Sequence, residues 1–68
     1  MSEQYFIQKC IISAEDAKGN YSMMAHLDVD KQTKQAYENM VTEINEQLHF
    51  LNNRYQYLQQ QSQKSDKS

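Results

Sequence analysis

Proline and tryptophan are absent from this 68-residue chain, and glycine and cysteine each occur once, at Gly19 and Cys10. A single cysteine excludes an intrachain disulfide and favours a reducing compartment, because small secreted domains carry paired cysteines. No apolar run approaches the roughly 20 residues that a membrane span needs. The N-terminus also lacks the basic flank and apolar stretch of a signal peptide. We therefore expect a cytoplasmic protein without a membrane segment.

Neither sign of charge predominates, and the formal net charge is only −2. Nucleic-acid-binding proteins usually present a basic face, because neutralising phosphates supplies most of their affinity. The seven lysine and arginine residues are instead scattered along the chain. Nucleic acid is therefore not the expected partner, and a nucleic-acid-binding transcriptional regulator is kept as an alternative function.

Two segments of the first thirty residues resemble β-strands. Residues 5–13 are rich in β-branched and aromatic side chains, and residues 21–29 alternate between apolar and polar. Gly19 lies between them, where a turn would need a positive φ. A β-hairpin over about residues 5–29 is predicted. Turn chemistry places Tyr5, Ile7 and Ile11 on its apolar face. A register shifted by one residue would replace them with Phe6, Cys10 and Ile12.

From Lys31 onward the pattern becomes helical. Neither proline nor glycine interrupts the chain, and either Asp28 or Asp30 can cap the helix. Apolar residues recur at alternating spacings of four and three, which predicts an amphipathic α-helix over about residues 31–61. We call this apolar stripe the seam; it consists of Tyr37, Val41, Ile44, Leu48, Leu51, Tyr55 and Leu58. Residues 62–68 are polar and predict a disordered tail.

The predicted fold class is therefore α+β, in the order β-β-α, as a single domain over residues 1–61. A domain of this size is only marginally stable unless disulfides, a metal or oligomerisation supports it. The first strand would be apolar on both faces, and the hairpin would be too short to cover Tyr55 and Leu58. These surplus apolar surfaces predict a homodimer with a shared sheet, a helix–helix seam, or both. Parallel and antiparallel pairing stay open.

The residues expected at this oligomer or partner interface come from both predicted elements. They are Val41, Ile44, Leu48, Leu51, Tyr55, Leu58, Tyr5, Ile7 and Ile11.

No catalytic, cofactor-binding or metal-binding residues are predicted. Cys10, His26 and His49 are the only thiol or imidazole ligands, and their spacing does not match that of a zinc site. The chain contains no nucleophile elbow, phosphate loop or paired-carboxylate motif. We therefore do not expect an enzyme.

By elimination, the expected function is that of a non-catalytic accessory or regulatory factor. It would act as a homo-oligomer that occludes or scaffolds a larger protein partner. Short, glutamine-rich chains of this kind are common among accessory proteins of bacteria and phages, which fits an inhibitor. A structural subunit of a larger assembly is the second alternative.

Overall fold

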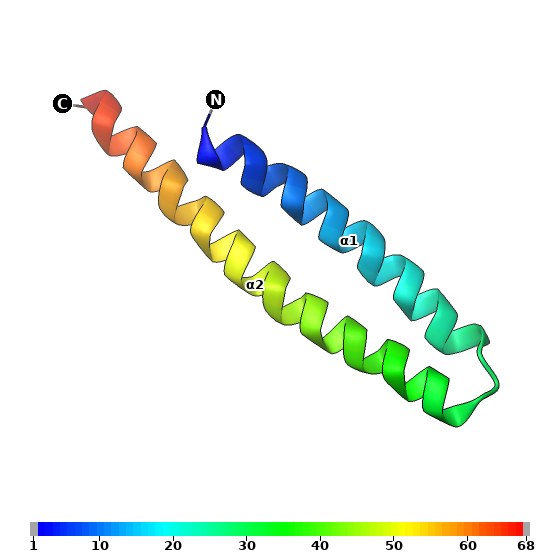
Figure 1. Cartoon of the computed structure of the whole chain (residues 1–68). Coiled ribbons are helices and arrows are strands. Elements are labelled where there is room, and N and C mark those ends of the chain that lie inside the picture. Colours follow the sequence, from blue (N-terminus) through cyan, green and yellow to red (C-terminus); the bar gives the residue numbers. More distant parts are fainter. Residues whose placement is uncertain (1, 68) are drawn as a thin grey trace.

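The computed structural model describes the backbone of residues 2–67 and the side chains of residues 2–61. Helix α1 spans Glu3–Leu27, and helix α2 spans Lys31–Lys67. Residues 28–30 connect the two helices, which lie side by side and run antiparallel (Figure 1). The result is a helical hairpin with dimensions of 58 × 17 × 13 Å.

The predicted α+β fold is wrong. Residues 3–27 form α1, and no strand occurs in the part of the chain that the structure describes, so the β-hairpin over residues 5–29 does not exist. Gly19 lies inside α1 and does not have a positive φ. A sheet shared between two copies is excluded along with the hairpin. The second element does begin at Lys31, where the seam predicts a helix.

The residues that suggested two apolar strand faces are distributed around α1 instead. Ile7 is buried, Ile11 is half-buried, and Phe6 and Ile12 are exposed. The alternation over residues 21–29 also contains a helical spacing, because Tyr21 and Ala25 are four residues apart. Strand propensity depends strongly on packing context, and here packing against α2 decides the conformation.

Side-chain oxygens cap both helices at their N-termini. Ser2 Oγ accepts a hydrogen bond from the Tyr5 N–H at 3.2 Å. Asp30 Oδ2 accepts bonds from the Thr33 N–H at 2.9 Å and the Thr33 hydroxyl at 2.7 Å. Asp28 does not cap α2: its Oδ1 accepts from the Asp30 N–H at 3.0 Å, and its own N–H closes α1 on the Met24 carbonyl at 3.0 Å. Asp30 is therefore the cap of α2.

The core is a single layer between the two helices. Its buried side chains are Ile7 and Ala25 from α1, and Ile44 and Leu48 from α2. Tyr55 and Leu58 are half-buried, so the expectation that they overhang is wrong. The reason is length: a 25-residue helix extends about 37 Å, whereas the expected strands would cover about 30 Å.

Of the tail predicted for residues 62–68, the structure describes only the backbone, and that only as far as Lys67. The backbone of α2 continues to Lys67, but the side chains of residues 62–68 are not described. The disordered tail and the domain boundary at residue 61 stay predictions.

Candidate functional site

The seam residues of α2 pack against α1 within one chain. Eight of the nine residues expected at an oligomer or partner interface belong to this internal contact, as buried or half-buried residues: Val41, Ile44, Leu48, Leu51, Tyr55, Leu58, Ile7 and Ile11. The ninth, Tyr5, is exposed, with the Lys9 ammonium 5.1 Å from its ring centroid. That any of the nine also contacts a second chain stays a prediction.

Polar contacts hold the register of the two helices away from the loop. The Arg54 guanidinium donates from Nε to Glu3 Oε2 and from Nη2 to Glu3 Oε1, both at 2.9 Å. This bidentate contact lowers the pKa of the Glu3 carboxyl, through its hydrogen bonds first and its charge second. Gln8 Nε2 donates to the Tyr55 hydroxyl at 2.8 Å. Exposed contacts of this kind contribute little free energy, but they fix which turns face each other.

Near the loop, an aromatic pair holds the register of the two helices. The rings of Tyr21 and Tyr37 lie with their centroids 6.1 Å apart. Such pairs stabilise beyond the area they bury. The register of the hairpin is thus held at both ends, which fixes the surface between them.

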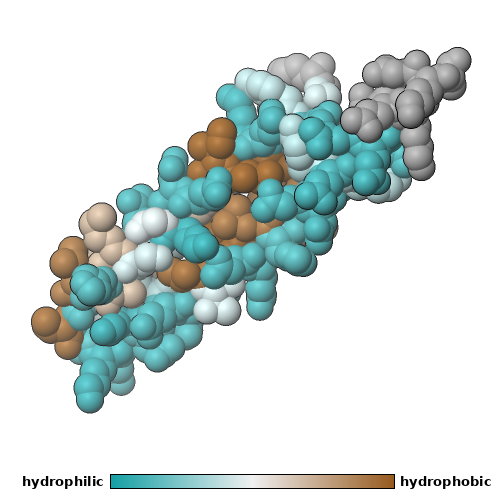
Figure 2. All heavy atoms as spheres, turned by 180° about the vertical axis from the view of Figure 1, so that it is seen from behind, coloured by the Kyte–Doolittle hydropathy of each residue, from teal (hydrophilic) through white to brown (hydrophobic). Residues whose placement is uncertain are grey.

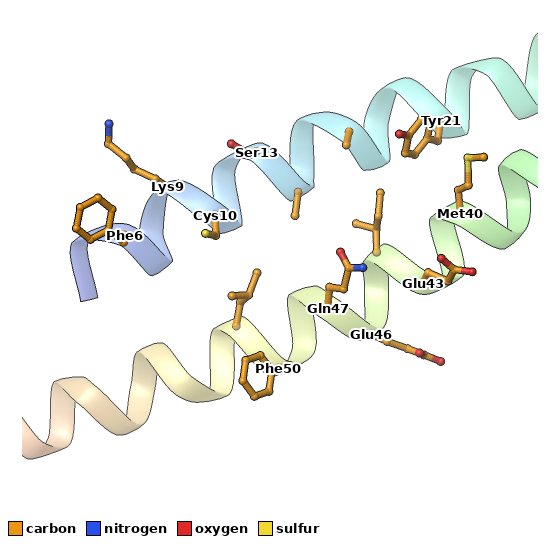
Figure 3. A pocket seen from close by; sticks show the side chains of 14 residues that line it. Phe6, Lys9, Cys10, Ser13, Tyr21, Met40, Glu43, Glu46, Gln47 and Phe50 are labelled. Carbon is orange, nitrogen blue, oxygen red and sulfur yellow. The ribbon is translucent and has the colours of Figure 1, made fainter. Parts of the chain in front are cut away.

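An open groove of about 1210 Å³ runs between the helices on one side of the core. Its walls include residues that immediately precede core-facing residues: Phe6, Cys10, Ser13 and Ala17 on α1, and Met40, Glu43, Gln47 and Phe50 on α2. In an antiparallel pair, positions that precede the core-facing residues of both helices fall on the same side. We call this the groove side. Figure 3 shows these side chains along the two facing helices.

The groove side exposes large apolar side chains. The exposed fraction is 67% for Phe50, 49% for Phe6 and 40% for Met40. Three charged residues, Lys9, Glu43 and Glu46, also line the groove and form its rim. Aromatic and methionine side chains within a polar rim are typical of protein-binding surfaces.

The opposite side of the hairpin, the polar side, has a different composition. It carries the residues that immediately follow the seam on α2, among them Thr42, Asn45, His49, Asn52, Gln56 and Gln59, and all six are exposed. On α1, Ile12 is the exception, with 60% of its surface exposed. Seen from behind relative to Figure 1, the surface shows brown patches between teal margins and a further brown patch at the loop end (Figure 2).

The structure separates the residues considered for chemistry. Cys10 lines the groove, whereas His26 lines a smaller depression near Ser22, Lys34 and Glu38. Among residues 2–61, no three His, Cys, Asp or Glu side chains gather closely enough to hold a metal ion.

Sequence reasoning missed the groove because it treated residues 5–13 as a strand. A usable signal was present in α2, where Met40 and Phe50 each precede a seam residue. Without a helical α1 there was no second wall, so these residues had no common surface.

Comparison with known proteins gives no relative: no family model, curated protein or solved structure matches this chain. Neither helix contains, within the residues described, a stretch with the length and hydrophobicity that a bilayer crossing demands.

Proposed function

We propose that this chain is a non-catalytic protein-binding module of the cytoplasm that binds an amphipathic helical partner in the groove. The observation that carries the proposal is the exposure of Phe6, Met40 and Phe50 along one open groove that runs parallel to two helices. A helix fits such a surface because its own apolar stripe fills the space between two neighbouring helices.

The charges of the groove favour a protein partner over nucleic acid. Lys9 contributes one positive charge, and Glu43 and Glu46 contribute two negative charges at the rim. A surface with this balance repels a phosphate backbone, whose binding needs clustered lysine or arginine. Mixed charges around an apolar centre instead match the rim of a protein interface.

The open form of the groove favours binding over catalysis. Catalytic sites exclude water around the reacting groups, and they hold a nucleophile or base within hydrogen-bonding reach of its partner. Cys10 and Ser13 line a groove open to solvent, and neither histidine lines it. The cytoplasmic location is supported by Cys10, an exposed free thiol, which a reducing compartment preserves.

Site-specific photocrosslinking in cells tests the proposal. The photoreactive amino acid p-benzoylphenylalanine replaces Phe50 in one variant and His49 in a matched control. The two positions are adjacent in sequence and both exposed, but only Phe50 lines the groove. We expect protein adducts from position 50 and few from position 49, identified by mass spectrometry of the purified chain.

The alternatives give different outcomes in the same experiment. Adducts to nucleic acid at position 50 would contradict the proposal, and so would equal protein labelling from both positions. Circular dichroism of both variants checks that the helices are retained.

A further inference from the structure

The distribution of side chains along the groove points to a specific occupant. We propose that the groove binds a second copy of this chain, with the two hairpins related by a two-fold axis and antiparallel to each other. This inference rests on the proposed function and names the partner of the same surface.

The two ends of the groove are complementary to each other. Phe6 and Lys9 of α1 lie at one end, and Met40 and Glu43 of α2 lie at the other (Figure 3). Each of these two pairs consists of one large apolar residue and one charged residue, three positions apart in sequence, which is about one helical turn. Phe50 of α2 lines the groove on the same half as Phe6. Because the helices are antiparallel, the apolar residue of each pair is the outer one and the charged residue the inner one.

The two-fold axis of this dimer passes through the middle of the groove, in the plane of the interface and perpendicular to the helices. It places each end of the groove against the opposite end of the partner's groove. Phe6 of one copy then meets Met40 of the other, and Lys9 meets Glu43. Every contact occurs twice, as in any closed two-fold interface. The parallel arrangement would instead place Lys9 near Lys9 and Glu43 near Glu43, so both charged pairs would be repulsive. The antiparallel arrangement leaves one like-charge contact, between the two copies of Glu46, which lies near the middle of the α2 wall.

Within the described residues, these charges have no ion-pair partner in their own chain. The one ion pair found there joins Glu3 and Arg54. The Lys9 ammonium lies 5.1 Å from the centroid of the Tyr5 ring. Lys9 and Glu43 are thus available for contacts between chains.

The elongated chain exposes more surface than a compact protein of its mass, which leaves enough for a dimer interface. The chain exposes 5504 Å², whereas a folded monomer of 8.1 kDa is expected to expose about 4500 Å² from the scaling of surface with mass. The excess is about 1000 Å², and a standard interface buries about 800 Å² on each partner. The core of one hairpin is correspondingly thin, since no described side chain is buried to less than 2% exposure.

The mass of the chain in solution, measured by light scattering and sedimentation over a range of concentrations, tests the dimer. We expect wild-type protein to have twice the 8.1 kDa mass at micromolar concentration. Phe50→Asp should weaken association by more than about thirtyfold, as expected when a charge replaces an aromatic anchor of an interface. His49→Asp, the matched control on the polar side, should leave the dimer intact.

Charge reversal tests the orientation. Lys9→Glu should weaken the dimer by about tenfold, because it creates two like-charge contacts in a two-fold interface. Adding Glu43→Lys to Lys9→Glu should restore the wild-type association to within about threefold, since it exchanges the two partners of the same pair. Lys31→Glu applies the same charge change outside the groove and should have no such effect.

Several results would overturn the inference. These are a wild-type monomer at high micromolar concentration, open association beyond the dimer, or a double charge reversal that fails to restore binding. A wild-type monomer whose position 50 still crosslinks to another protein would remove the dimer while leaving the proposed function in place.

Discussion

In α2 the apolar residues concentrate on the seam, whereas in α1 they occur on nearly every side of the helix. The seam of α2 repeats at spacings of four and three from Tyr37 to Leu58 without a break. In α1, Phe6 lines the groove, Ile7 is buried, and Ile12 is exposed on the polar side. A helix with one apolar stripe specifies its own packing, but a helix such as α1 is oriented by its partner.

Truncating the core should produce the largest loss of stability. Leu48 lies in the regular seam of α2 and is buried, so Leu48→Ala should lower the free energy of unfolding by about 2–5 kcal/mol. Ile12→Ala removes a comparable aliphatic side chain from the exposed surface of α1. It should change the free energy of unfolding by less than about 0.5 kcal/mol. Urea denaturation followed by circular dichroism, at one fixed protein concentration, measures both. Equal losses would mean that the seam does not decide the packing.

The caps of the two helices should respond differently to acid. Hydrogen bonds from the Thr33 hydroxyl and backbone hold the pKa of Asp30 below its ordinary value of 3.8. A lowered pKa in the folded state means that the cap stabilises the protein fully above pH 3.8. This contribution is lost as the pH falls through the folded-state pKa. The Ser2 cap of α1 does not titrate.

The substitution Asp30→Asn isolates this titration. Asparagine accepts the same capping bonds but carries no charge. As the pH falls from 5, the variant should therefore lose less stability than the wild type. Thermal unfolding across an acid pH series measures the difference, which should be smaller than the effect of Leu48→Ala. If acid lowered the stability of both proteins equally, other carboxyls, such as Glu3, would dominate the acid response.

The smallest effect should be a gain in stability at Gly19 of α1. Glycine inside a helix costs about 0.5–1 kcal/mol relative to alanine. A Cβ atom at this position would meet no other atom within 4 Å, so Gly19→Ala should raise the free energy of unfolding by that amount. Asn20→Ala, at the next exposed position, is the control for a general change in helix propensity. A loss of stability would contradict the helix and fit a turn with positive φ.

The second half of the fold could be predicted because several local features agree there. The regular seam, the capping aspartates and the absence of proline and glycine all indicate a helix from Lys31. Agreement of this kind across several levels is what specifies an element. Asp28 and Asp30 were not separable from sequence, since the choice depends on where the loop turns.

The first half could not be predicted because its local features conflict. Residues 5–13 have the composition of a strand, Gly19 has the character of a turn residue, and the core-facing positions of α1 include Lys18 and two alanines. Only the packing of Ile7 and Ala25 against α2 resolves the conflict. The groove depends on two helices at once, so it could not be found while one of them was taken for strands.

The short connection at residues 28–30 places Ser2 and the C-terminal part of α2 at the same end of the hairpin (Figure 1). A force that separates these two ends therefore acts across the seam and not along it. Under such a load the helices would separate one turn after another, beginning with the contact between Glu3 and Arg54. A force applied between Ser2 and the loop would instead act along α1, so the same molecule would be mechanically weak in one direction and resistant in the other.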